Sequence, residues 1–206
     1  MKIHACSIIA AAALALPALA AADTPKTSSS NSATSDANGK LSADDTKIVA
    51  HLHHVNQMEI DLGKQAQKVG TPAVKGYADA LVSDHTSGDK DLTALAKKHG
   101  VSSIPADKPQ TDADRQDEKD MTIQMTHLKT LKGAEFDKAF LTMMASGHDK
   151  ELAKIDTAIG TAKDSDLQAQ LKATKPVLQR HADQARDLQK GPQAANPASA
   201  TTQPAK

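Results

Sequence analysis

The apolar residues between positions 41 and 190 recur with the spacing of an α-helix, and no stretch shows the two-residue alternation of a half-buried strand. Three glycines and the prolines near them divide this region, and the predicted helices cover residues 42–69, 72–99, 111–131, 134–162 and 165–190. Only 1% of the residues are aromatic, so the core has to be built from aliphatic side chains, which suits helices better than sheets. An all-α fold is therefore expected.

Four of the five predicted helices are long, at about 25 residues or about 38 Å each. Each long helix carries one apolar stripe, as in helices that bury one face in a bundle. The shorter helix at 111–131 lies between the second and third long helices, and one long crossover of this kind is typical of ferritin-like bundles. We therefore predict a ferritin-like four-helix bundle with an extra connecting helix, and we expect Pro176 to kink or split the last helix.

The first residues of the chain have the pattern of a cleavable signal peptide. Lys2 precedes a short apolar run that ends at Leu16, and Ala18 and Ala20 supply the small residues that a signal peptidase requires. Residues 1–22 are therefore predicted to be removed, and the mature protein is expected in the periplasm or associated with the envelope.

Two further segments lack apolar periodicity. Residues 23–40 and 191–206 are rich in small and polar residues, and we interpret them as a disordered linker and a disordered tail around a bundle domain at 41–190.

The 25 basic and 25 acidic residues give a formal net charge of zero, so we expect no nucleic-acid partner. No stretch of the predicted mature chain is apolar enough to span a membrane, and its tails could attach the bundle to envelope partners.

Each long helix also places one protonatable residue in phase with its apolar stripe. These residues are Glu59, His85, His148 and His181. Since a buried charge without a partner costs several kcal/mol, the four side chains are expected to meet in the bundle core. Three imidazoles and one carboxylate could bind a divalent metal ion such as zinc, copper or iron. A metal-free network of hydrogen-bonded histidines, and histidines that reach the bundle surface, stay open as alternatives.

A second candidate set lies early in the first helix, where His51, His54 and Met58 share one face. A stripe of this kind suits copper, but a solvated helix face with Met58 in the core is the simpler interpretation. Asp84 is adjacent to His85 and could orient an imidazole.

Motifs for catalysis are missing from the sequence. There is no glycine-rich phosphate loop, no serine elbow and no zinc-protease signature. The paired Glu-x-x-His motifs of di-iron bundles are also missing, because Val82 and Ala145 stand where glutamates are needed. We therefore predict no catalytic residues, and the sequence favours a protein that is not an enzyme.

Several short motifs follow one another along the chain in a distinctive order and spacing. They are MEIDLG at 58–63, VKGYA at 74–78, SDHT at 83–86, GAEFDKAF at 133–140, His148, and KPVLQRH at 175–181. Together they resemble the bacterial envelope family known as domain of unknown function 4142, over about residues 46–188.

The resemblance implies a ferritin-like bundle exported by Gram-negative bacteria and often described as an outer-membrane or membrane protein, with no established activity. It places Glu59, Asp84, His85, His148 and His181 at the characteristic polar positions of the family. The chain departs from the pattern at position 147, where Gly replaces the usual Asp, and this speaks against a symmetric two-metal site.

The sequence therefore predicts an exported, non-enzymatic helical bundle that has a candidate site for a divalent metal ion and acts in envelope maintenance or stress tolerance. A ferritin-like metalloenzyme that handles iron or peroxide is one alternative. A purely structural or partner-binding bundle is the other.

Overall fold

The computed structural model describes residues 39–191, which form five helices and no strand. The helices are α1 (Ala43–Val69), α2 (Pro72–Lys98), α3 (Asp112–Leu128), α4 (Gly133–Thr161) and α5 (Ser165–Gln189). The predicted all-α fold is therefore confirmed. The predicted signal peptide and nearly all of the predicted linker and tail lie outside the described residues. Within the described part of the chain, none of the helices combines the length and the apolar character that crossing a membrane requires.

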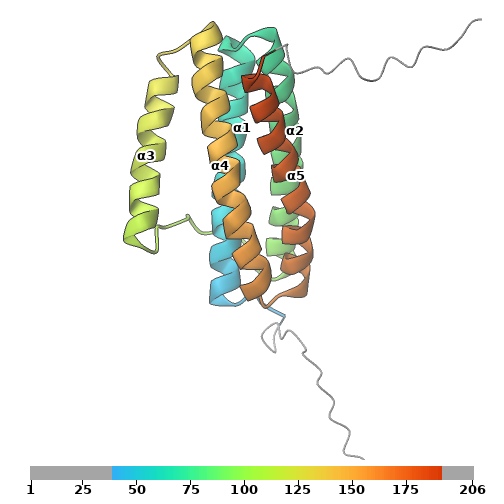
Figure 1. The fold of residues 1–206 in the computed structure, drawn as a ribbon. Coiled ribbons are helices and arrows are strands. Elements are labelled where there is room, and N and C mark those ends of the chain that lie inside the picture. The colour runs from blue at the N-terminus through green and yellow to red at the C-terminus, as the bar shows by residue number, and fades with distance from the viewer. Residues whose placement is uncertain (1–38, 192–206) are drawn as a thin grey trace, which may run out of the picture. The chain divides into compact units, whose positions relative to one another are not determined.

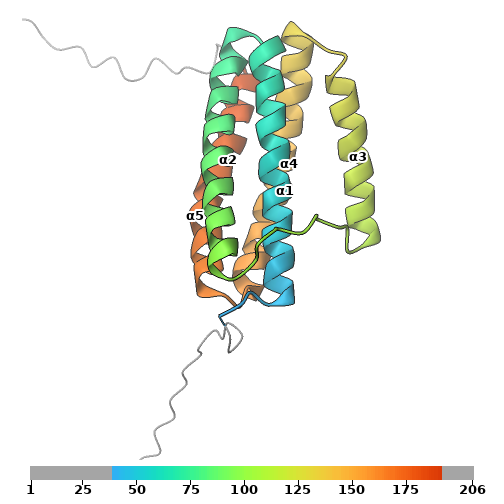
Figure 2. The ribbon, with the colours of Figure 1, turned by 180° about the vertical axis from the view of Figure 1, so that it is seen from behind.

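The four long helices stand side by side as two antiparallel hairpins (Figure 1). α1 packs along α2 and α4 packs along α5, while contacts between α2 and α5 and between α1 and α4 close the bundle. The view from behind shows α3 on the outer side of α4, where it returns the chain from one end of the bundle to the other (Figure 2). Because of this single long crossover α2 and α4 run in the same direction, a connection that ferritin-like folds also use.

Local sequence signals determine where the helices begin and end. The hydroxyl of Ser42 accepts a backbone hydrogen bond in the first turn of α1, and Thr111 and Asp114 form a reciprocal capping box at the start of α3. α3 ends at Leu128, earlier than predicted, because the chain then tightens into a three-residue turn. Gly133 has a φ of 58°, a conformation that favours glycine, and it is the first residue of α4.

Pro176 lies inside α5, and the helix continues through it. Of the two outcomes predicted for this proline, the splitting of the helix does not occur. Pro176 is exposed, and so is Lys172, whose carbonyl loses its helical hydrogen-bond donor to the proline ring. Since solvent can hydrate that carbonyl, the cost of proline at this position is reduced.

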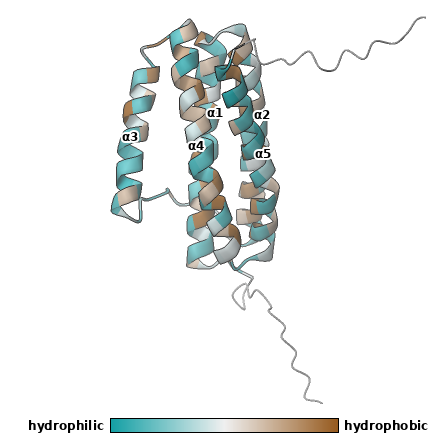
Figure 3. Cartoon of the chain, viewed as in Figure 1, coloured by the Kyte–Doolittle hydropathy of each residue, from teal (hydrophilic) through white to brown (hydrophobic). Residues whose placement is uncertain are grey.

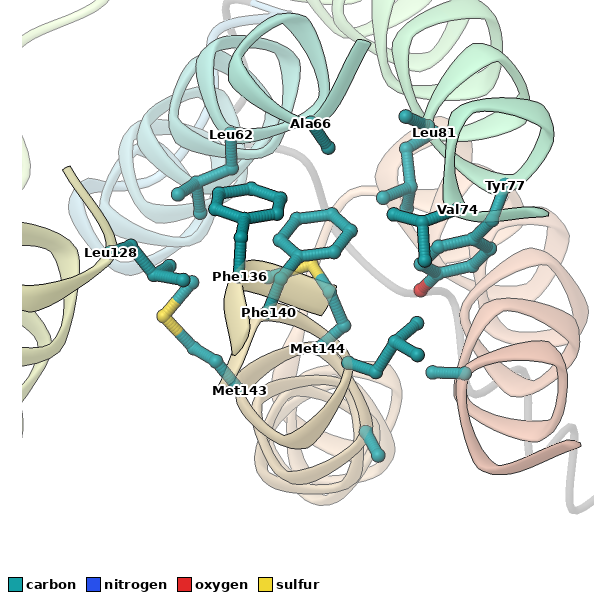
Figure 4. Close-up of a cluster of buried hydrophobic side chains, with 14 residues drawn as sticks. Leu62, Ala66, Val74, Tyr77, Leu81, Leu128, Phe136, Phe140, Met143 and Met144 are labelled. Carbon is teal, nitrogen blue, oxygen red and sulfur yellow. The ribbon is translucent and has the colours of Figure 1, made fainter. Parts of the chain in front are cut away.

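The bundle buries two clusters of apolar side chains. The upper cluster, at the end where α1 meets α2 (Figure 4), includes Leu62, Tyr77, Leu81, Phe136, Phe140 and Met144. The lower cluster, at the opposite end, includes Val49, Leu52, Leu92, Ile155, Leu167 and Leu178. α3 is mostly hydrophilic (Figure 3) and contributes only Leu128 as a buried residue. The hydrophobic core therefore belongs almost entirely to the four long helices.

Gly63 allows α1 to approach α2 closely. A Cβ atom at this position would lie 2.7 Å from Val82 Cγ2 and 3.2 Å from the carbonyl oxygen of Ala78. We expect Gly63→Ala to lower the free energy of unfolding by about 1 kcal/mol, because overpacking outweighs the gain in helix propensity. Gly76→Ala is the matched control in α2, where a Cβ atom has no neighbour within 4 Å and should stabilise the helix by about 1 kcal/mol. Urea denaturation measures the free energy of unfolding of both variants. Equal changes in the two would contradict the close approach of α1 to α2.

Candidate metal site

The middle of the bundle contains a polar layer between the two apolar clusters. Each long helix contributes one buried ionisable residue to this layer: Glu59 from α1, His85 from α2, His148 from α4 and His181 from α5. Their exposed fractions are 5%, 4%, 1% and 0% respectively. Along each helix, residues of the upper cluster lie on one side of this position and residues of the lower cluster on the other.

His85, His148 and His181 face one another across the layer. The ring centroids lie 6.0 Å apart for His85 and His148 and 5.3 Å apart for each of the other two pairs. Each ring offers one nitrogen, and these three atoms all lie within 4.8 Å of one another. A zinc ion between these three nitrogens would need Zn–N distances of ~2.0–2.1 Å, which requires the rings to move closer together.

The other nitrogen of each ring is held by a hydrogen-bond acceptor. The pairs are His85 Nδ1 with Asn56 Oδ1 at 2.9 Å, His148 Nδ1 with the Met144 carbonyl oxygen at 2.8 Å, and His181 Nε2 with Asp84 Oδ2 at 2.9 Å. Because amide, carbonyl and carboxylate oxygens accept, each of these ring nitrogens carries the proton and donates it. The second nitrogen of each ring is then an unprotonated donor of the kind that metals bind.

These second nitrogens have no hydrogen-bond partner among residues 39–191. They are His85 Nε2, His148 Nε2 and His181 Nδ1, and all three are buried. A buried polar atom without a hydrogen bond costs about 1–3 kcal/mol. One metal ion bound between the three rings would satisfy all of them at once.

The electrostatics of the layer keep the imidazoles of His85 and His181 neutral. Burial lowers the pKa of His85 to about 3, and the nearby His148 and His181 add to the effect. Burial also lowers the pKa of His181 to about 4, although the carboxylate of Asp84 opposes the change. At Asp84 burial acts to raise the pKa, but hydrogen bonds from His181 and Arg180 outweigh it and hold the pKa below its usual value. Neutral imidazole is the protonation state that metal binding requires.

Glu59 is buried in the same layer without joining the three nitrogens. Its carboxylate is not part of the group of ligand atoms that lie within 4.8 Å of one another, and its Oε2 atom has no hydrogen-bond partner. Burial raises the pKa of Glu59, an effect that His148 opposes and Glu151 strengthens. Tyr77 has a buried hydroxyl without a partner, and burial together with the nearby Glu59 raises its pKa. The predicted four-residue set is thus assembled as three histidines with Glu59 beside them.

A cleft between α1, α2 and α5 borders this layer at His85. Its volume is about 200 Å³, and His85 forms part of its wall together with Asn56, Gly88 and two carboxylates, Asp84 and Asp91. Negative charge along a narrow cleft raises the local concentration of cations. The carboxylates of the cleft therefore favour cations near His85.

Asp84 should tune metal affinity through His181. We expect Asp84→Ala to weaken metal binding by about 10- to 100-fold, because the ring then loses the acceptor that orients it. Asp79→Ala is the control, since it removes the same charge from an exposed position of the same helix. Isothermal titration calorimetry with zinc compares the two variants, and equal affinities would contradict the role of Asp84.

The residues of the second candidate set do not come together. Both ring nitrogens of His51 are bonded to carboxylates, to Asp107 at 2.8 Å and to Glu151 at 3.0 Å. His54 is exposed, and Met58 is partly buried against the upper cluster. The three side chains therefore have three different environments, as on an ordinary helix face.

The sequence pattern singles out Asp84, but neither Asn56 nor Tyr77. Asp84 bonds His181 on the opposite helix rather than its neighbour His85, because adjacent residues of a helix point in different directions. Asn56 precedes Glu59 by less than one turn and shares its helix face, which is the signal that could have identified it. Tyr77 is apolar in its ring, and nothing in the pattern distinguishes it from an ordinary core residue.

Another group of ligand atoms lies where α2 ends and α5 begins. It comprises His99, Asp164 and Asp166. Asp164 caps α5 by accepting hydrogen bonds from the backbone N–H groups of Asp166 and Leu167, and Lys98 pairs with Asp166. Helix capping and ion pairing therefore account for this group.

Comparison with known proteins places the chain in one family. No curated protein and no solved structure matches it. Residues 30–188 match the family described as Domain of unknown function (DUF4142), which spans the region of the resemblance seen in the motifs. Because the match covers more than half of the chain, this protein belongs to the DUF4142 family.

Proposed function

We propose that this protein is an exported, non-enzymatic helical bundle that binds a divalent metal ion through His85, His148 and His181. The observation that carries the proposal is a set of three buried histidines from three different helices. Each offers a ring nitrogen within 4.8 Å of the others, and each has one buried ring nitrogen without a hydrogen-bond partner among residues 39–191. Each ring is also oriented by an acceptor on its far side, as is typical of histidines that bind metals.

The donor set limits which metals fit. Imidazole nitrogens suit zinc, copper and iron, whereas calcium and magnesium prefer oxygen ligands. A carboxylate-bridged di-iron centre needs several glutamates, and Val82 and Ala145 occupy two of the positions concerned. The proposal is therefore a single-metal site rather than an oxygen-activating centre of the ferritin-like enzymes.

A metal-free hydrogen-bond network accounts less well for the same residues. Such a network needs hydrogen bonds among the four side chains, yet the inward-facing nitrogens and Glu59 Oε2 have no partner in the described part of the chain. Each of these atoms would keep its desolvation cost. A bound metal ion removes that cost for the three nitrogens.

Metal analysis of the mature protein, purified without a histidine tag, tests the proposal. We expect about one zinc, copper or iron ion per chain by inductively coupled plasma mass spectrometry, or uptake of about one ion by the metal-free protein. His54→Ala removes an exposed imidazole and should leave the stoichiometry unchanged. A chain that takes up none of the three metals would contradict the proposal and favour a structural or partner-binding bundle.

We also propose that the bundle acts in the periplasm or at the envelope, in envelope maintenance or stress tolerance. This rests on the signal-peptide pattern of residues 1–22. The intact mass of the exported protein should correspond to cleavage after Ala20 or Ala22. A chain that keeps Lys2 and sediments with the membrane fraction would contradict cleavage.

A further inference from the structure

Within the described part of the chain, the group of ligand atoms at the proposed metal site comes from three residues and has no fourth member. Metal sites with three protein ligands commonly complete their coordination with water, which leaves one position exchangeable. Among the four predicted residues of the polar layer, Glu59 is the one carboxylate, and it is the candidate for a fourth ligand. If Glu59 binds the metal directly, the site has four protein ligands. If Glu59 binds a water ligand of the metal instead, one coordination position stays exchangeable.

The position of Glu59 speaks against direct binding. Its oxygens do not belong to the compact group formed by one nitrogen each of His85, His148 and His181. Glu59 lies close enough to His148 and to Tyr77 to interact electrostatically with both, so it is a neighbour of the group rather than a member.

Tyr77 presents a second unpartnered polar atom next to the same group. Its ring stands edge-on to that of His181, with the centroids 6.2 Å apart, and its hydroxyl points into the bundle interior (Figure 4). The Tyr77 hydroxyl and Glu59 Oε2 are both buried without a hydrogen bond. A buried water needs two to four polar partners, and these two atoms with a metal ion would provide them.

We infer that Glu59 and Tyr77 bind a water or hydroxide ligand of the metal rather than the metal itself. The inference rests on the proposed function and deepens it. The site then has three histidine ligands and one exchangeable position, with Glu59 and Tyr77 as positioning residues. A small anion such as azide can replace the water at this position.

Electron paramagnetic resonance of the copper-loaded mature chain tests the inference. In ¹⁷O-enriched water we expect broadening of the Cu²⁺ signal, which shows a bound water oxygen, and azide should remove it. Glu59→Gln and Tyr77→Phe should each keep the broadening, because no direct ligand is lost, and should weaken copper binding by no more than the roughly 10- to 100-fold that is typical of outer-shell residues. The proton hyperfine couplings of the water should change in both variants and stay constant in Glu135→Gln, an exposed control on α4.

The possible failures can be told apart. If the unchanged chain binds no copper, zinc or iron, the proposed function fails and this inference fails with it. If copper binds without broadening by ¹⁷O, the metal has no water ligand and only the inference is overturned. If Glu59→Gln weakens copper binding by far more than about 100-fold, beyond the range of outer-shell residues, Glu59 acts as a metal ligand and again only the inference is overturned. Unchanged proton couplings in both variants would likewise overturn the positioning role. The conservative Tyr77→Phe change keeps the test valid if Glu59→Gln does not fold.

Discussion

His85→Ala is expected to abolish stoichiometric binding of zinc, copper or iron. The change removes one of three converging nitrogens, and two imidazoles cannot hold a divalent ion with comparable affinity. In the unchanged protein, metal at about 100 times its dissociation constant should raise the free energy of unfolding by about 2.7 kcal/mol, since binding stabilises the native state by mass action. In His85→Ala this metal-dependent gain should disappear. Thermal denaturation with metal and with chelator measures it.

The same experiment separates metal binding from a metal-free network. If His85 serves only as a hydrogen-bonding core residue, its loss should cost about 1–3 kcal/mol whether or not metal is present. His54→Ala provides the control, because this exposed histidine should leave the metal-dependent gain intact. A gain that survives in His85→Ala would contradict the proposed site.

Phe140→Ala is expected to cause the largest loss of stability, at about 3–5 kcal/mol. Phe140 is fully buried in the upper cluster, with its ring centroid 5.4 Å from Phe136 and 6.1 Å from Tyr77. The truncation removes the whole ring and leaves a cavity that the surrounding side chains refill only in part. Urea denaturation monitored by circular dichroism measures the free energy of unfolding.

Ile123→Ala is the control for this prediction. Ile123 is 66% exposed on α3, and its truncation should change the free energy of unfolding by no more than about 0.5 kcal/mol. A loss of similar size in both variants would mean that the upper cluster does not dominate the stability of the bundle.

Helical period, glycines and capping residues determined most of the fold. The five helices lie where the sequence predicts them, with differences at their ends and no split at Pro176, because these features depend on residues close together in the chain. The same local pattern put Glu59, His85, His148 and His181 on apolar faces, and all four are buried. A helical phase specifies which face a residue occupies, and burial follows when that face is apolar.

Tertiary packing decided which side chains meet. The structure brings three histidines together and leaves Glu59 beside them, pairs Asp84 with His181, and assigns Asn56 to His85. The physical reason is that contacts between helices depend on how far each helix is rotated about its axis and shifted along it. Arrangements that bury the same faces can differ in both respects. Sequence periodicity therefore identified the buried polar candidates, whereas the packing of the four helices decided which of their side chains lie together.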